Sequence, residues 1–281
     1  MLVKKGERVS YNSRKDNHMR IACVRFFDIF CKLVGTHLLI ARKGIVDQVI
    51  NLYIWAGITL VVMGYIMQSF GLMQGYGLFQ LASIMAVVGL FEVYATATKV
   101  IMDIEGDRSI SYYLTLPARP SVVLLSMVSS YAVICLMLTF VLLPFGKMIF
   151  FHDFNLATIS WLRFVIMAIL ANVFFAIFTM VMVGKVGTIS KMRNIWMRFM
   201  VPLWWLGCYQ FSWKAMYGLS MPLGYLLLCN PVTFITEGMR ASLLGQSGFL
   251  PWELCCAALC CYIMIFWFYA YYKMKRLLDF V

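Results

Sequence analysis

The sequence predicts an all-α integral membrane protein with six transmembrane helices, an N-terminal interfacial amphipathic helix and a re-entrant helical hairpin before the last transmembrane helix. First, residues 48–91 contain no Asp, Glu, Lys or Arg, and this is about twice the ~20 apolar residues that one helix needs to cross a bilayer. Second, 63% of the 281 residues are hydrophobic and 13% are charged, which leaves no room for a separate soluble domain of ordinary size. Third, further uncharged runs follow at 120–146, 164–184, 199–213, 215–236 and 254–272. Because lipid cannot satisfy free backbone groups, we expect these runs to be helical.

The distribution of positive charge predicts the topology. The net charge is +12, and twenty of the 24 Lys and Arg residues lie before residue 44 or in the segments 99–119, 185–198 and 273–276. Six crossings with cytoplasmic N- and C-termini place all of these segments inside, as the positive-inside rule requires. We therefore expect a multi-pass protein of the bacterial cytoplasmic (inner) membrane. The basic charge then indicates contact with membrane lipid, and no nucleic-acid partner is expected.

The N-terminal region divides into a polar cytoplasmic leader, residues 1–18, and an amphipathic interfacial helix, residues 19–43, whose charged side chains share one face. This helix is either an anchor on anionic lipid or a lever between a cytoplasmic partner and the first crossing helix, and the two roles are compatible. Transmembrane helices are expected at 48–67 and 78–102. Glu92 lies in the second of these helices, where it either has a structural role, by pairing with Lys99 or by extending to the membrane interface, or belongs to a transport pathway.

The segment 103–120 is too structured for a simple linker. It contains an acidic patch followed by a short amphipathic helix and a proline-flanked stop. The next two crossing helices are expected at 122–143 and 161–183.

A fifth crossing helix is expected at 195–211 and a sixth at 252–272, with a re-entrant segment, 217–245, between them. Two short half-helices are expected there. For the second, Asn230 is a predicted N-cap, Pro231 fits the first turn, Glu237 and Arg240 face each other at i, i+3, and Gly245 ends the helix. A helix of roughly 14 residues is about 21 Å long, too short to cross. We therefore expect it to enter from the outer face and return, as part of a gate or vestibule.

Three aromatic residues, Trp204, Trp205 and Tyr209, lie toward the predicted outer end of the fifth helix. They form either an interfacial aromatic belt or part of a path for an amphipathic cargo. The nine cysteines include no CxxC pair and no Cys/His set with zinc spacing, so no metal site is expected. No Walker-type phosphate loop occurs in the chain.

The order of these elements, together with two motifs, resembles the permease subunit of ABC-2 type ABC transporters. Residues 103–107 with 114–117 (Leu-Thr-Leu-Pro) resemble the family's acidic-glycine, leucine-rich and proline segment, which forms the coupling helix. Residues 230–234 (Asn-Pro-Val-Thr-Phe), with Glu237, Arg240 and Gly245, resemble its Asn-Pro…Glu-x-x-Arg…Leu-Gly segment. The family's common Gly-Thr after the acidic residue is Asp107-Arg108 here.

The resemblance implies an ATP-driven exporter in which two permease copies pair, as a homodimer, and a separate ABC ATPase subunit binds ATP and Mg on each side. This chain would then be no enzyme and would carry no cofactor of its own. The residues expected to couple it to the ATPase are Asp103, Glu105, Gly106, Asp107, Arg108, Leu116 and Pro117. The expected gate residues are Asn230, Pro231, Glu237, Arg240 and Gly245, and the candidate substrate-path residues are Glu92, Trp204, Trp205 and Tyr209.

A hydrophobic or amphipathic cargo, such as a drug-like molecule, lipid or lipid-linked saccharide, fits the scarcity of polar groups in the predicted helices. The alternative is a secondary transporter driven by an ion gradient, which normally shows repeat symmetry and several buried charges. An intramembrane enzyme is less favoured, because no nucleophile, base or metal cluster appears at a suitable depth.

Overall fold

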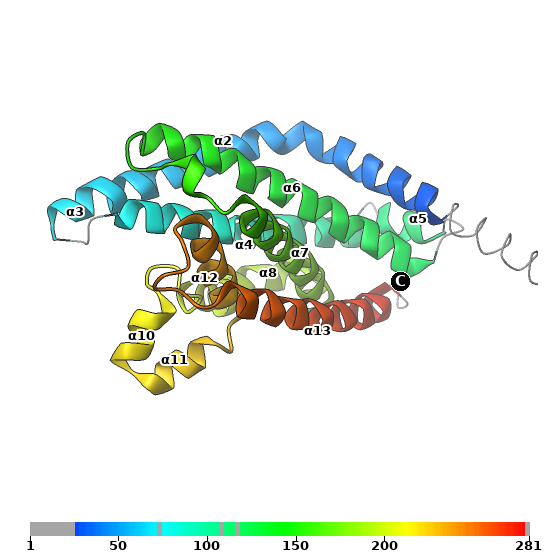
Figure 1. Cartoon of the computed structure of the whole chain (residues 1–281). Helices are drawn as coiled ribbons and strands as arrows, with labels where there is room; N and C mark the ends of the chain where they lie inside the picture. The colour runs from blue at the N-terminus through cyan, green and yellow to red at the C-terminus, as the bar shows by residue number, and fades with distance from the viewer. Residues whose placement is uncertain (1–25, 72–74, 107–108, 116–118, 279–281) are drawn as a thin grey trace, which may run out of the picture.

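The computed structural model describes residues 26–71, 75–106, 109–115 and 119–278. Within these ranges every regular element is helical, as expected. Five helices are long and apolar enough to cross a membrane, and they lie side by side in one bundle (Figure 1): Phe26–Ser69, α4 (Tyr76–Glu105), α6 (Pro120–Ile149), α7 (Trp161–Val186) and α13 (Trp252–Leu278). One end of the bundle carries the short helix α5 (Ser109–Thr115) and the other carries α12 (Pro231–Leu243). We call these the α5 end and the α12 end.

The bundle has central and peripheral helices. In the most apolar windows of α4, α6 and α7, between 61% and 72% of residues are buried, against 17% in the first helix and in α13. The first and last long helices therefore present apolar side chains to their surroundings, as lipid-facing or partner-facing helices do. Close approach between the central helices depends on small residues. At Gly89 of α4, for example, an added Cβ would lie 2.6 Å from Cδ2 of Phe175 on α7.

The predicted interfacial helix and first crossing helix form one continuous helical stretch, Phe26–Ser69. A 3₁₀ turn, Arg42–Gly44, joins residues 26–41 to α2 (Ile45–Val61), and a π turn, Val62–Ile66, leads into α3 (Met67–Ser69). The expected break at 44–47 is therefore a bend within a helix, visible where the blue ribbon changes direction in Figure 1. The 26–41 part contacts α5, since the rings of His37 and Tyr113 meet edge to face at 5.4 Å. The leader, residues 1–18, lies outside the described residues.

The helix expected at 195–211 has the expected length but begins and ends six residues earlier along the chain, at Ile189 and Trp205. Three elements, α8 (Ile189–Ile195), a π turn (Trp196–Met200) and α9 (Val201–Trp205), form one stretch of 17 helical residues. Such a stretch is about 26 Å long, slightly less than the ~30 Å hydrocarbon core. Beyond Trp205 the backbone leaves the helix and Cys208 adopts a positive φ of 55°. The structure thus has five long helices and this shorter one.

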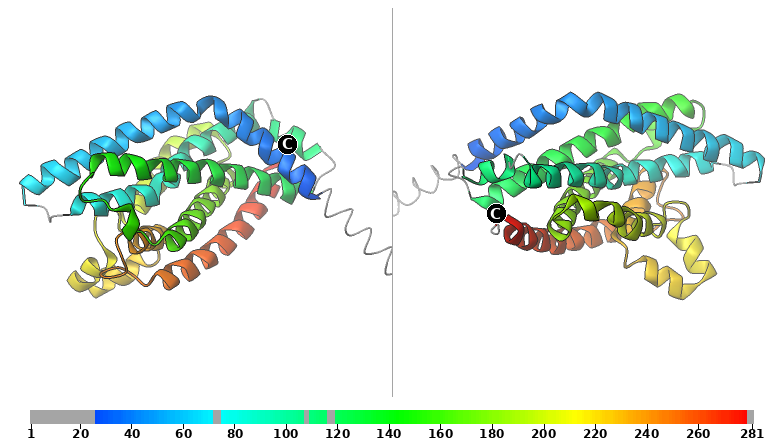
Figure 2. Two further views of the ribbon diagram at one scale, coloured as in Figure 1. Left: turned by 45° about the horizontal axis from the view of Figure 1, so that its top comes forward. Right: turned by 180° about the vertical axis from the view of Figure 1, so that it is seen from behind.

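The segment before α13 contains three helices, although only two half-helices were expected. The first two, α10 (Trp213–Leu219) and α11 (Met221–Leu227), form a hairpin that projects from the bundle in Figures 1 and 2. The indole Nε1 of Trp213 donates to the carbonyl of Gly224 at 2.8 Å and holds the two helices together. By contrast, every residue of the third helix, α12, is buried, and it packs against α4, α7 and α13.

Candidate functional site

The local structure of α12 follows the sequence-based prediction. Asn230 caps the helix, because its Oδ1 accepts a hydrogen bond from the backbone N–H of Val232 at 3.0 Å. Pro231 occupies the first helical position, where no backbone donor is needed. The helix ends at Leu243, and Gly245 follows with a positive φ of 98°, a conformation that costs glycine little. These three residues fix the position of α12 along the chain.

Glu237 and Arg240 of α12 form a fully buried ion pair, with 3.1 Å between Oε1 and Nη1 and no exposed side-chain surface on either residue. The carboxylate of Glu237 has two further partners. Its Oε1 accepts from the N–H of Trp213 at 3.0 Å, and its Oε2 accepts from the N–H of Leu250 at 3.1 Å. Glu237 therefore joins the start of α10 and the loop before α13 to α12.

The guanidinium of Arg240 connects α12 to α4 and to the irregular segment after α9. It donates to the hydroxyl of Ser83 from Nη2 at 2.7 Å and from Nε at 3.1 Å. Its Cζ also lies 3.7 Å from the centre of the Phe79 ring, in a cation–π contact. The backbone carbonyls of Cys208, Tyr209 and Phe211 accept from Arg240 at 2.6, 2.8 and 3.1 Å. We call Glu237, Arg240, Ser83 and these three carbonyls the Arg240 cluster.

The cluster is part of a longer pattern, because six consecutive carbonyls, 206–211, each accept a hydrogen bond from a side chain. Thr233 donates to Leu206 at 3.4 Å, Thr236 donates to Gly207 at 2.8 Å, and the Tyr76 hydroxyl donates to Gln210 at 2.6 Å. Arg240 donates to the other three carbonyls. Buried backbone outside a helix is stable only when such partners exist. These donors were not predicted from the sequence. Thr233 and Thr236, two threonines three positions apart inside an apolar run, were a usable signal.

The Arg240 cluster is suited to holding structure together rather than to catalysis. Its charges neutralise each other, and its donors and acceptors are engaged by backbone or by Ser83. In the described residues no group of three His, Cys, Asp or Glu side chains is placed to hold a metal ion.

At the α5 end, the acidic residues of the predicted coupling segment contact the starts of two short helices. Asp103 accepts from the N–H groups of Ser109 and Ile110 with its two carboxylate oxygens, at 3.2 and 3.0 Å, and so caps α5. Glu105 accepts from the N–H of Ile189, the first residue of α8, at 3.3 Å. Gly106 ends α4. The other expected coupling residues, Asp107, Arg108, Leu116 and Pro117, lie outside the described residues.

Only some of the candidate substrate-path residues are in contact with one another. Trp204 contacts Phe91 of α4 and Tyr209, with ring centres 5.2 and 5.1 Å apart. Trp205 is half exposed. Glu92, the neighbour of Phe91, accepts a hydrogen bond from Gln48 of α2 at 3.3 Å. Among the described residues, Lys99 forms no ion pair with Glu92 within 4.0 Å.

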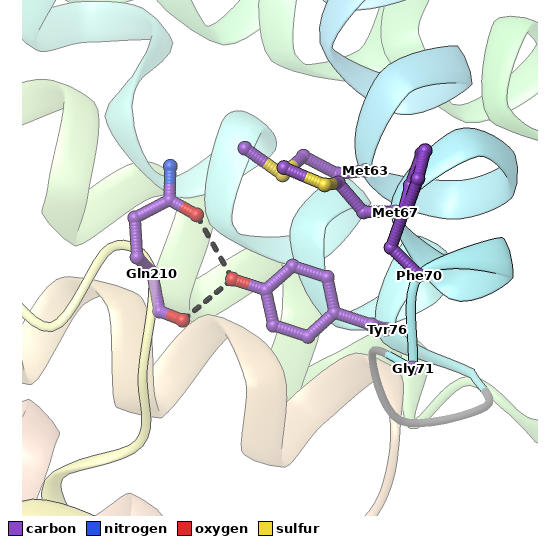
Figure 3. Close-up of a pocket in the computed structure, with 6 residues that line it drawn as sticks. All are labelled: Met63, Met67, Phe70, Gly71, Tyr76 and Gln210. Carbon is purple, nitrogen blue, oxygen red and sulfur yellow. Dashed lines mark hydrogen bonds between the residues drawn. The ribbon is translucent and has the colours of Figure 1, made fainter.

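A hollow of about 410 Å³ lies at the α12 end, between the end of the first long helix and the start of α4. Figure 3 shows the hydroxyl of Tyr76 directed at Gln210, where it meets both the backbone oxygen and Oε1, at 2.6 and 2.9 Å. In the same view the thioether groups of Met63 and Met67 lie over Tyr76. We call this space the Tyr76 hollow; the residues that line it are Met63, Met67, Phe70, Gly71, Tyr76 and Gln210.

The long apolar helices, the buried ion pair and the side-chain-supported backbone are those expected of a multi-pass helical membrane protein. The chain matches no model of a known protein family, and no curated protein is significantly similar to it.

Proposed function

We propose that this chain is the permease subunit of an ATP-driven ABC-2 type exporter. The observation that supports the proposal most is that one uninterrupted helix, α4, connects the two sites. At one end it carries Asp103 and Glu105, which contact α5 and α8, and at the other end its Phe79 and Ser83 contact Arg240. Ser83 and Asp103 are about 30 Å apart along the helix axis. A force applied to the α5 end would therefore reach the Arg240 cluster without passing through a flexible joint.

In this proposal a separate ABC ATPase subunit docks at the α5 end, where Glu105 and Gly106 are exposed. ATP and Mg belong to that subunit, and this chain has no catalytic role. Closure of the ATPase moves α4 and the first long helix relative to the rest of the bundle, as in a two-state rigid-body switch. A second copy of the chain, in a homodimer, covers part of the apolar surface that the first and last long helices present.

The proposed topology has six crossings, with the stretch 189–205 as the fifth and α12 as a helix that enters the membrane without crossing it. The α5 end faces the cytoplasm of a bacterial cell, and both termini lie on that side. Five basic residues at the α5 ends of α7, α8 and α13 support this orientation by the positive-inside rule: Lys185, Lys191, Lys273, Lys275 and Arg276. The cargo is hydrophobic or amphipathic, because the described interior holds few charged groups other than the neutralised Glu237–Arg240 pair.

The proposal is tested by affinity purification of the tagged chain from bacterial membranes in mild detergent, followed by mass spectrometry. We expect a Walker-motif ATPase to co-purify, and nucleotide hydrolysis to be lost when that subunit is removed. A purified chain that never carries such a subunit would refute the proposal.

Two variants of Glu105 separate its contact with α8 from its role in docking. Glu105→Gln keeps an acceptor oxygen for the N–H of Ile189 and removes the charge, whereas Glu105→Lys removes both. If the charge docks the ATPase, both variants lose co-purification and transport while membrane insertion stays normal. Glu253→Lys is the control, since Glu253 is exposed at the α12 end. Normal transport by Glu105→Lys would show that docking occurs elsewhere.

The alternative, an ion-gradient-driven secondary transporter, is favoured by one observation: a carboxylate, Glu92, is half-buried in the middle of α4 and bonded to Gln48. It predicts transport into vesicles that needs no ATP and no ATPase subunit, and that stops when the proton gradient is collapsed. Glu92→Gln would abolish transport in that case and leave it largely intact in an ATP-driven exporter.

A further inference from the structure

The Tyr76 hollow has walls that suit the apolar part of a ligand. Four of its six lining residues are methionine or aromatic side chains, and none of the six is charged. Methionine side chains are flexible and polarisable, so Met63 and Met67 can adapt to differently shaped apolar groups. A volume of about 410 Å³ lies within the range of small-molecule sites.

The hollow also contains an oriented polar group. The hydroxyl of Tyr76 is held by the backbone oxygen and Oε1 of Gln210, which fixes the side-chain amide of Gln210. No described residue accepts a hydrogen bond from the Nε2 of this amide. Gln210 is therefore positioned to donate to a molecule in the hollow.

Behind the wall of the hollow, one helical turn after Tyr76 on α4, lies another polar residue, Gln80, which does not line the hollow. Gln80 is fully buried, and neither its Nε2 nor its Oε1 has a hydrogen-bond partner among the described residues. The hydroxyl of Tyr209 lies beside Gln80 without forming a hydrogen bond of acceptable geometry, and the Nε1 of Trp204 is also without a partner. Buried polar side chains almost always have partners. These atoms have no accessible surface and do not line the hollow, so they make the protein behind it polar and uncharged without contacting a molecule inside it.

We propose that the Tyr76 hollow binds the apolar part of a neutral amphiphile, and that the amide of Gln210, in the wall of the hollow, hydrogen-bonds its uncharged polar head. The polar groups in the wall are the amide of Gln210 and the hydroxyl of Tyr76, which together donate and accept, so they match a head that carries hydroxyl or amide groups. A charged head would lose its hydration there without meeting an opposite charge, because Glu237 already neutralises Arg240. This proposal rests on the proposed function only for its statement that the bound molecule is cargo.

The test uses the purified chain in lipid nanodiscs and three photoreactive probes with the same diazirine-bearing alkyl chain. One probe has a glucoside head, one a sulfate head and one a trimethylammonium head. We expect saturable labelling of the lining residues Met63, Met67 and Tyr76 by the glucoside probe, competition by non-photoreactive octyl glucoside, and weak labelling by the two charged probes. Equal labelling by all three, or labelling that does not saturate, would overturn the proposal.

Two substitutions on the first long helix locate the site. Met67→Trp fills the hollow and should abolish the saturable labelling. Ile58→Trp is the matched control, because Ile58 lies on the same long helix, is 62% exposed and does not line the hollow. If Met67→Trp leaves the labelling unchanged, the hollow is not the binding site.

Gln210→Leu distinguishes a ligand-binding role from a structural role. It removes the side-chain amide but keeps the backbone carbonyl that accepts from Tyr76, so the thermal unfolding temperature should change little, while glucoside-probe affinity falls roughly two- to tenfold, the usual effect of a lost neutral hydrogen bond. Gln80→Leu, behind the wall, is the matched control and should leave the affinity unchanged. Unchanged affinity in Gln210→Leu, whatever the stability, would show that the amide does not serve the ligand. The assay contains neither ATP nor an ATPase, so its outcome does not depend on whether an ATPase partner is found.

Discussion

The buried ion pair gives the most demanding prediction. Arg240→Leu removes the positive charge beside Glu237 and the hydrogen-bond donors to Ser83 and three backbone carbonyls. Breaking a buried ion pair by removing one partner typically costs about 3–5 kcal/mol, because the remaining charge stays buried without compensation. Each carbonyl left unsatisfied adds about 1–3 kcal/mol unless water reaches it. We therefore expect a loss of at least about 3 kcal/mol in the free energy of unfolding.

The assay is equilibrium unfolding of the purified protein in mixed micelles by increasing SDS, with hydrogen exchange measured in parallel. Arg240→Leu should also increase exchange in residues 206–213, since Arg240 holds three carbonyls of that segment. Arg240→Lys should be intermediate, because an ammonium keeps the charge but cannot reproduce the planar fork of the guanidinium.

The matched control is Arg163→Leu. Arg163 pairs with Glu253 at 3.5 Å, but their side chains are 41% and 69% exposed. Exposed pairs contribute about 0–1 kcal/mol, so this variant should unfold almost like the wild type. If Arg240→Leu loses less than about 1 kcal/mol, or no more than Arg163→Leu, then the Arg240 cluster does not stabilise the α12 end as we reason.

Two further predictions concern single contacts, and both are measured in the same unfolding assay. Asn230→Ala removes the N-cap of α12 and should lower the free energy of unfolding by about 0.5–2 kcal/mol. Asn155→Ala, which removes a similar cap from an exposed 3₁₀ turn, is its control and should lower it less. An equal or smaller loss at Asn230 would contradict its role in placing α12. Gly89→Ala places a methyl group 2.6 Å from the ring of Phe175 and should cost about 1–3 kcal/mol through overpacking between α4 and α7. Gly218→Ala is its control, because an added Cβ there meets no atom within 4 Å, and similar stabilities for the two variants would show that α4 and α7 separate at little cost.

Agreement between the predicted and the observed elements depends on how far apart along the chain the interacting residues lie. Predictions that depend on neighbouring residues were accurate: Asn230, Pro231 and Gly245 bound α12 as expected, and Glu237 reaches Arg240 across one turn. The expected helix 195–211 instead ends at Trp205, because an apolar run carries no sign of where the backbone leaves the helix. Spacing along one helix suggested pairing with Lys99 as one of the alternatives for Glu92, and the structure instead shows a hydrogen bond from Gln48 on another helix.

The predicted coupling residues also show that local features were predicted and distant contacts were not. The sequence indicated that Asp103 and Glu105 lie at the end of a helix and are available to a partner. It did not indicate that the two carboxylates also contact the first N–H groups of α5 and α8. The contact from Glu105 to Ile189 joins residues 84 positions apart, and no local pattern encodes such a distance.

By itself, the sequence determined that the protein is helical, which runs are apolar enough to cross a bilayer, and where the caps of α12 lie. These properties follow from bilayer thickness, charge and local hydrogen bonding, all of which are readable along the chain. Only the tertiary structure decided that Arg240 reaches Ser83, 157 positions away, that six consecutive carbonyls are held by side chains, and that the Tyr76 hollow forms beside the unpaired Gln80. Those features depend on the packing of helices against one another, which brings together donors and acceptors that are distant in sequence.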